Sequence, residues 1–313
     1  MSMQRGPVVV GLDGSESATH ALRWAAGQAS LEGRRLTLVH AASVSAAFGD
    51  ASVVSSVEVQ ALLRREGTAI LEAGRALVAQ VAPRVEVDTD YELDNAGQAL
   101  LRRSEEAALV VVGTHGRGPL RSFVLGSVGV TLVKHASCPV VVHRPGTSAG
   151  HAGGIVVAAD AAQESQPVLA AAWRQADLTG RALTVVHCVE DAAFALSREE
   201  LVAGRHESRE QASLALAEAV AGLAQTYPDV VVSTQVRTGS VRAALVALDG
   251  EPDLVVVGGH QRSLPRQLAR GAGSTSVHVV EHASWPVMVV PVGVPGRRTR
   301  GQRRDAPSPA ATS

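Results

Sequence analysis

The sequence contains a single lysine, Lys134, among its 29 basic residues. Phosphate-binding loops of the GxxxxGK[ST] type need a lysine at the end of a glycine-rich turn, and Lys134 follows no such turn. The chain therefore lacks this kind of loop. Any phosphate that it binds has to be held by other groups, such as backbone N–H groups, hydroxyls or arginines.

The chain also lacks an excess of either charge sign, has few cysteines and has no long apolar runs. The 29 basic and 30 acidic residues give a net charge of −1, which provides no overall attraction for nucleic acid or for an anionic membrane. No apolar stretch is long enough for a signal peptide or a membrane span. Both cysteines, Cys138 and Cys188, lie inside apolar runs, which predicts buried, reduced thiols and a cytoplasmic protein.

The chain is long enough for two domains, and an internal repeat indicates that these are copies of each other. Its 313 residues are 46% hydrophobic and 19% charged, which are ordinary values for globular domains of about 100–200 residues. Solenoid repeats have periods of roughly 20–50 residues, so a much larger offset describes duplication of a whole domain. Four segments of the first half recur in the same order in the second half: 8–13 as 155–160, 36–40 as 183–187, 108–113 as 253–258 and 135–140 as 282–287.

The repeat divides the chain into two domains, a linker and a tail. We predict a first domain over residues 6–144 and a second over 154–293. Glycine, proline and serine are enriched in the segment between them, 145–153, which is typical of a linker. The segment 294–313 is rich in proline, arginine and serine without any apolar period, which predicts a disordered tail.

Within each copy, short β-branched runs alternate with Ala-, Leu- and Arg-rich segments of helical period. Runs such as 109–112 are apolar on both faces, as expected for a parallel sheet that helices cover on both sides. The predicted fold class is therefore α/β, with two doubly wound, five-stranded parallel-sheet domains of the Rossmann-like type. The predicted strands are 7–12, 35–41, 85–92, 108–113, 138–143, 154–159, 182–188, 229–237, 253–258 and 285–291.

An acidic residue ends the first predicted strand. Doubly wound sheets bind ligands beyond the carboxyl ends of their strands, where Asp13 lies. Asp13 is also well suited to cap the helix that begins near Ser15. The two roles are compatible, so both are expected of this side chain.

A glycine pattern follows the fourth predicted strand. The arrangement Gly113-x2-Gly116-x9-Gly126-Ser127 puts glycines where the backbone approaches a ligand closely, and then a glycine and a hydroxyl at the start of a helix. The free N–H groups of that helix favour an anion. We expect a phosphate chain there to be bound by backbone N–H groups, the Ser127 hydroxyl and Arg117.

The glycine pattern after a valine-rich strand, the aspartate that ends the first strand and the segment 135–142 together resemble the universal stress protein family, in its ATP-binding class. The resemblance spans both copies and implies a fold like that of the adenine nucleotide α hydrolases. It also implies a stress-response regulator that binds ATP. The residues that it assigns to the nucleotide are Asp13 at the adenine or ribose end, Ala41 in the adenine pocket, Gly113, Gly116, Gly126 and Ser127 at the ribose and phosphates, and Val140 in the pocket wall.

The second copy departs from this pattern. Gln261 stands where the second glycine belongs, and the helix start Gly273–Ser274 comes 15 residues after Gly258, against 13 in the first copy (126 − 113). A side chain and two extra residues therefore lie where the phosphates would pass. Asp160 and Ser274 remain, so the sequence predicts nucleotide binding that is weakened or lost in this copy.

Other functions stay open at this point. An ATP-using enzyme of similar architecture and a ligand-free scaffold share the fold. We predict no catalytic residues, because no base, acidic pair or lysine accompanies the glycine pattern, and any ATP hydrolysis should be slow. His278 and His282 have the spacing of a metal pair, but no third ligand accompanies them, so no metal site is predicted.

The expected partners are few. The first is an adenine nucleotide. Whether Mg²⁺ accompanies its phosphates, with Ser127 as a ligand of the metal ion, is left open. Nucleic acid and membranes are not expected. Single-domain relatives pair as dimers, so the resemblance implies an internal pseudo-dimer of the two copies. A homodimer and an unidentified protein partner remain open.

Overall fold

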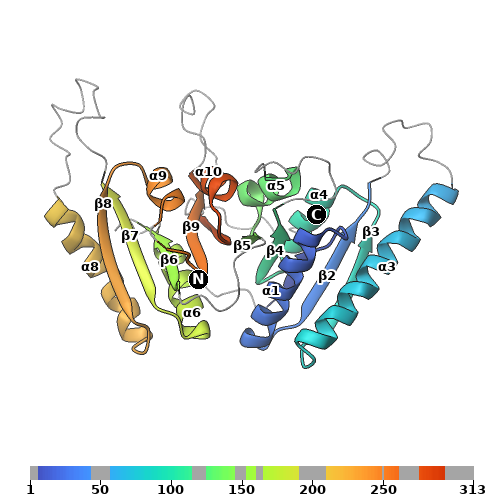
Figure 1. Ribbon diagram of the computed structural model, residues 1–313, viewed down its shortest axis with the longest axis horizontal. Coiled ribbons are helices and arrows are strands. Elements are labelled where there is room, and N and C mark those ends of the chain that lie inside the picture. The colour runs from blue at the N-terminus through green and yellow to red at the C-terminus, as the bar shows by residue number, and fades with distance from the viewer. Residues whose placement is uncertain are drawn as a thin grey trace, which may run out of the picture.

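The computed structural model describes residues 6–43, 57–114, 125–144, 153–159, 165–189, 209–248, 250–260 and 275–292. Strands and helices alternate through both copies, as Figure 1 shows. The first copy comprises β1 (Val8–Gly11), α1 (Glu16–Glu32), β2 (Leu36–Ala41), α3 (Val57–Val81), β3 (Val87–Glu92), α4 (Ala96–Ser104), β4 (Leu109–Gly113), α5 (Ser127–His135) and β5 (Val140–His143). The second comprises β6 (Ile155–Ala158), α6 (Gln166–Thr179), β7 (Leu183–Val189), α8 (Arg209–Thr226), β8 (Val232–Thr238), α9 (Val241–Val246), β9 (Leu254–His260), α10 (Thr275–His282) and β10 (Val287–Val292).

All ten strands form one sheet, in the order β3-β2-β1-β4-β5-β10-β9-β6-β7-β8. Within each copy every pair of neighbouring strands is parallel, which confirms the predicted α/β class. The two five-stranded sheets also join edge to edge. β5 and β10 pair antiparallel, with Val141 opposite Met288, so the two sheets are continuous. This pairing satisfies backbone groups that two inner edge strands would otherwise leave open.

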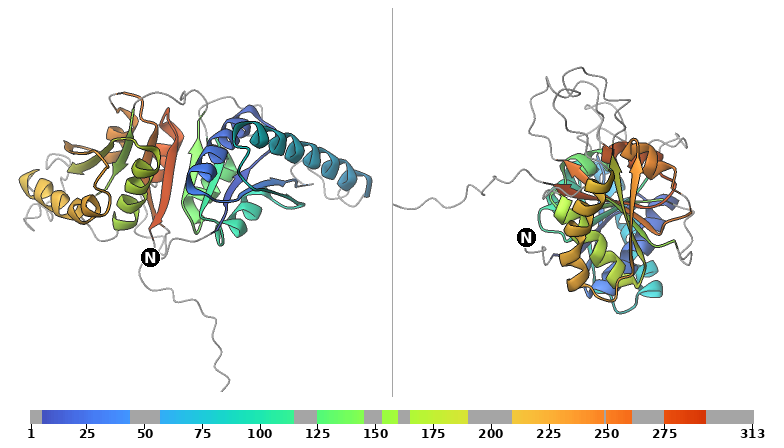
Figure 2. Two further views of the ribbon diagram at one scale, coloured as in Figure 1. Left: turned by 90° about the horizontal axis from the view of Figure 1, so that it is seen from below. Right: turned by 90° about the vertical axis from the view of Figure 1, so that its left-hand side faces the viewer.

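Helices cover both faces of the sheet, as the end-on view in Figure 2 shows. Successive side chains of a strand point to opposite faces. Val8 and Val10 accordingly pack in one core cluster with α1, α3, α6 and α8, whereas Val9 packs in the other with α4, α5, α9 and α10. The valine-rich runs are apolar throughout because each face has its own layer of helices.

Side chains also join the two copies outside the sheet. Glu32, at the end of α1, is only 4% exposed and forms an ion pair with Arg174 of α6. Arg144, which follows β5, donates from Nη2 to the carbonyl oxygens of Val280 (2.6 Å) and Glu281 (2.8 Å) on α10. A positive charge at the last turn of a helix is favourable, so this contact anchors the first copy on the second.

The two cysteines differ in their surroundings. Cys138 is buried, and burial raises the pKa of its thiol to about 12, so it stays protonated. Cys188 is free as well, but it is half-buried, which corrects the expectation that both thiols are fully enclosed. It lies near the end of β7, the strand next to the edge strand β8, opposite Arg237. None of the helices in the described ranges is both long and apolar enough to cross a bilayer.

Parts of the predicted organisation lie outside the described residues. These are the tail 294–313 and the linker apart from Gly153. The division of the chain at these boundaries stays a prediction.

Candidate functional site

A pocket opens at the carboxyl ends of β1, β2 and β4, where the strand order of the first copy reverses direction. Ligands of doubly wound sheets bind at such a reversal, because neighbouring connections leave on opposite faces and open a crevice. The cavity has a volume of about 200 Å³. It is lined by Gly11, Leu12, Asp13, Ala18, Val39, Ala41, Ala96, Leu100, Val112, Gly113, Thr114, Gly126, Ser127, Val128 and Gly129.

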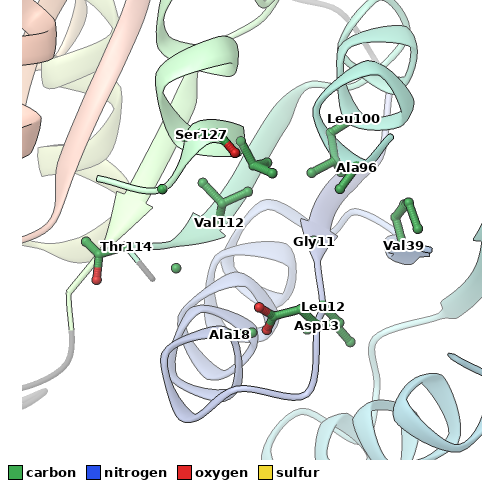
Figure 3. Close-up of a pocket in the computed structure, with 15 residues that line it drawn as sticks. Gly11, Leu12, Asp13, Ala18, Val39, Ala96, Leu100, Val112, Thr114 and Ser127 are labelled. Carbon is green, nitrogen blue, oxygen red and sulfur yellow. The ribbon is translucent and has the colours of Figure 1, made fainter. Parts of the chain in front are cut away.

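Five residues named from the sequence meet in this pocket, although they come from four separate parts of the chain: Asp13, Ala41, Gly113, Gly126 and Ser127. In Figure 3 the Asp13 carboxylate and the Ser127 hydroxyl lie on opposite sides of the cavity. Val140 is 1% exposed in β5 and belongs to the core cluster beneath, so it is not one of the lining residues. Gly116 and Arg117 lie outside the described residues.

The amino terminus of α5 offers the pocket backbone donors. Gly126 is its N-cap and supplies no side chain to accept a hydrogen bond from the first turn. The two other helices at the pocket rim are capped, α1 by the Ser15 hydroxyl and α4 by the Asn95 side chain. Within the described part of the chain, the first N–H groups of α5 therefore keep their hydrogen-bonding capacity and the positive end of the helix dipole faces the cavity.

Gly126 leaves room that a side chain would take. A Cβ built at this position meets only the Thr114 carbonyl oxygen, at 3.6 Å, which is ordinary contact. The backbone there is extended (φ −60°, ψ 154°), so a larger residue fits without strain. The local backbone therefore does not require a glycine here. The absence of a side chain leaves the space in front of α5 open.

Gly113 has a different reason. A Cβ on Gly113 would lie 2.4 Å from Ser17 Oγ and 2.8 Å from the Ser17 carbonyl carbon. The first turn of α1 rests directly on the end of β4, and only glycine permits this approach. From the sequence, Gly113 was expected to let the backbone approach a ligand closely. In the structure it lets α1 approach the end of β4 closely.

Asp13 does not cap α1, contrary to one of its expected roles. The cap is Ser15, whose Oγ accepts from the N–H of Ala18 at 3.1 Å. Asp13 instead accepts from the N–H of Ser15 through Oδ1, at 2.9 Å. This short turn holds the carboxylate at the pocket edge. Asp13 is also the one ionisable side chain among the described lining residues.

Several lining residues were not singled out from the sequence. Val39, Ala96 and Leu100 form an apolar wall that Figure 3 shows to one side of Asp13. Their apolar side chains resemble core positions, and only the strand order shows that they face a cavity. Thr114 directly follows Gly113, so a hydroxyl next to the glycine pattern was the one signal that was available for it.

The second copy keeps part of this arrangement. His40 Nδ1 lies 2.7 Å from the Leu12 carbonyl oxygen, and His187 Nδ1 lies 3.2 Å from that of Ala159. These bonds tie the second strand of each copy to the segment after the first, which gives both histidines a structural role. Gly258 lies in β9, whereas Asp160, Gln261, Gly273 and Ser274 lie outside the described residues.

Comparisons with known proteins agree with this architecture. A universal stress protein of Mycolicibacterium smegmatis is 29% identical over 287 residues, covering 90% of this chain and 96% of that protein. One of Mycobacterium tuberculosis is 32% identical over 292 residues, with the same coverage. The solved universal stress protein of Archaeoglobus fulgidus superposes with a TM-score of 0.66 at 15% identity, covering 93% of this chain and 98% of that one, which supports the fold.

One further solved structure is a universal stress protein in complex with cAMP. It covers 44% of this chain with a TM-score of 0.33, so its ligand remains a property of that protein. The sequence profile of the universal stress protein family matches residues 5–144 and 153–291. With both copies matched, this chain belongs to the universal stress protein family as a tandem member.

Proposed function

We propose that this tandem universal stress protein binds ATP in the pocket of the first copy and acts as a nucleotide-dependent regulator in the stress response. One observation carries the proposal. Five residues named from the sequence converge on a cavity at the strand-order reversal, in front of a helix with no side-chain cap. Their groups suit the two ends of a nucleotide.

The phosphates are expected at α5. Backbone N–H groups and the dipole of a helix favour an anion, and the Ser127 hydroxyl adds a further donor. A site of this kind binds phosphate without a lysine, which is consistent with the lack of a loop lysine in this chain. Arg117 is proposed to contribute from the loop that follows Gly113. Whether Mg²⁺ accompanies the phosphates is decided by titrations with and without it.

The nucleoside is expected on the opposite side. Val39, Ala96 and Leu100 provide an apolar wall for a flat base, and Ala41 keeps that wall shallow. The Asp13 carboxylate can accept a hydrogen bond from a ribose hydroxyl or from the adenine amino group. The site thus combines an apolar end, a carboxylate and an anion-binding helix.

The proposed output is binding and not rapid turnover. Asp13 is held by the Ser15 N–H and is the single ionisable group of the described lining. No pair of acid and base is brought together around the cavity within the described residues. We therefore expect phosphate release from ATP to be slow. Rapid release stimulated by a second substrate would favour an ATP-using enzyme.

The experiment compares wild type with Gly126→Asp by isothermal titration with ATP. An aspartate at an N-cap accepts from the same N–H groups that the phosphates need, and it adds a like charge. We expect affinity to fall by about 100-fold or more while the melting temperature is kept or raised. Gly222→Asp is the matched control, because Gly222 is exposed on α8 with nothing within 4 Å of its added Cβ.

Two outcomes overturn the proposal. If wild type gives no binding heat and no nucleotide is released from the purified protein, the pocket takes a different ligand. If Gly126→Asp binds ATP as tightly as Gly222→Asp, the phosphates do not lie at α5.

A further inference from the structure

A second cavity lies between the two copies and shares no lining residue with the first. Its volume is about 600 Å³. In the first copy it is bounded by the start of β4 and by the segment before β5. In the second copy it is bounded by α6 and β10. The lining residues are Glu32, Ala108, Leu109, Ser137, Cys138, Pro139, Gln166, Pro167, Ala170, Ala171, Arg174, Gln175, Met288, Val290 and Pro291.

The lining is apolar and carries no net charge. Leu109, Met288 and Val290 contribute hydrocarbon to its wall, although each is 5% exposed or less. The two charged lining residues, Glu32 and Arg174, are paired with each other. Glu32 also accepts from Arg34 Nε at 2.7 Å and from the Gln28 side chain at 2.6 Å. A charged ligand would therefore meet a carboxylate and a guanidinium that already neutralise each other.

The fold does not by itself require this hollow. The repeat relates residues of α6 to residues of α1 at an offset of 147, so that Ala171 corresponds to Trp24 and Pro167 to His20. Val290 corresponds in the same way to His143. On that other side of the junction, the rings of His20 and His143 stack with their centroids 6.5 Å apart.

At these three positions the counterparts carry larger side chains than this side does, whereas at Arg174 the counterpart, Gly27, is smaller. Trp24 is packed against the same core cluster as α6. Among the pairs, the difference between Ala171 and Trp24 removes the most volume from this side. An apolar hollow that is left open to water is unfavourable unless an apolar group covers it.

We propose that the cavity binds a neutral, predominantly apolar small organic molecule that touches both copies. Its volume lies within the range of about 300–1,000 Å³ that is usual for small-molecule sites. The apolar wall provides the contact area, while the Gln166 and Gln175 amides and the Ser137 hydroxyl suit one uncharged polar group of the ligand. Because the ligand contacts β4 of one copy and α6 and β10 of the other, its binding stabilises their packing.

The test uses the full chain and the neutral fluorescent probe N-phenyl-1-naphthylamine. Wild type is expected to bind it saturably, with about one probe per chain. Ala171→Trp places in the cavity the side chain that Trp24 supplies at the counterpart position, and is expected to weaken binding by about tenfold or more. Asp177→Trp is the matched control: it adds the same ring at an exposed position of the same helix and is expected to bind like wild type.

A second variant guards against misfolding. Ala171→Leu fills the cavity only in part and should give an intermediate affinity, with an unchanged far-ultraviolet circular dichroism spectrum. Equal affinities for Ala171→Trp and Asp177→Trp, or the absence of saturable binding by wild type, would overturn the proposal. Gly126→Asp should bind the probe like wild type, because the nucleotide pocket shares no residue with this cavity. Loss of probe binding in that variant would also contradict it.

Discussion

The two copies share the positions that build the sheet and differ at the positions that line the first pocket. Both use a histidine near the end of the second strand to hold the segment after the first, and both end their first helix with a left-handed glycine, Gly33 and Gly180. The strand order of one copy is the mirror image of the other across the β5–β10 junction. The architecture therefore does not depend on the pocket.

Several of the differences around the pocket reduce space, whereas Ala159 in place of Leu12 and Gly259 in place of Thr114 enlarge it. Gly11 corresponds to Ala158, and Ala41 corresponds to Cys188, at the offset of 147 residues. Helices α4 and α9 align through their N-caps, Asn95 and Ser240, so that Ala96 corresponds to Val241. At Gly11 an added Cβ would already lie 2.9 Å from Leu100 Cδ1. We propose that these residues, together with Gln261, narrow the nucleotide site of the second copy while its fold is kept.

The largest expected effect concerns His143, whose counterpart is Val290. Burial, and then the neighbouring His20, lower the pKa of His143 from its usual 6.5 to about 4. Below pH 6.5 this histidine is protonated in the unfolded chain, whereas in the folded chain it stays neutral until about pH 4. The free energy of unfolding therefore decreases as the pH is lowered from 6.5 to about 4. The loss reaches up to about 3 kcal/mol, from 2.5 pKa units.

Urea unfolding at pH 7 and pH 4.5 measures this effect. His143→Val gives the first copy the residue of the second and should lose less stability between the two pH values than wild type does. An identical pH dependence in both proteins would show that His143 is not responsible.

The next comparison sets Gly113 against Gly258. Gly113→Ala places a Cβ 2.8 Å from a backbone carbon of α1, which has to move, whereas Gly258→Ala meets only side-chain methyl groups, of Val292 and Val168, at 3.0 and 3.3 Å. We expect losses of about 2–3 kcal/mol and about 1 kcal/mol, respectively. Chemical denaturation of both variants checks this order. Equal losses would mean that α1 adapts as easily as the valines do.

Ala96→Val and Ala41→Cys transfer residues of the second copy into the pocket of the first. Each narrows the wall expected to receive the base, so ATP affinity should fall by about tenfold, or about 1.4 kcal/mol, in the double variant. The melting temperature should stay within a few degrees of wild type. Isothermal titration measures the affinity. Unaltered binding would remove these residues from the account of why the copies differ.

The smallest effect concerns the N-caps of helices α4 and α9. Asn95 Oδ1 accepts from the N–H groups of Gly97 (2.9 Å) and Gln98 (3.3 Å), whereas the Ser240 side chain makes no cap bond. Asn95→Ala should therefore lower the free energy of unfolding by about 1 kcal/mol, and Ser240→Ala by much less. Thermal unfolding of the two variants separates these values. A larger loss in Ser240→Ala would contradict the assigned caps.

Local patterns in the sequence were sufficient for much of the fold and part of the site. Repeats and apolar runs predicted the strands, because a buried parallel strand needs an apolar residue at every position. Asp13, Gly126 and Ser127, which the patterns at strand ends and helix starts indicated, line one cavity.

Long-range packing accounts for what was missed. The pairing of β5 with β10 joins segments far apart in the chain, and neither strand carries a signal for its partner. Val39 and Leu100 read as core residues because a pocket wall and a core have the same composition. The cap of α1 fell to Ser15 and not to Asp13, because the helix begins one residue after Ser15 and the aspartate is too early to reach its first turn.

We propose that one copy of this fold binds ATP and that the other has lost most of its ability to do so. Native mass spectrometry of the full chain with ATP tests it directly by counting bound nucleotides. We predict about one ATP per wild-type chain, and none in Gly126→Asp at the same concentration. Two nucleotides per wild-type chain, or one that persists in Gly126→Asp, would contradict the account.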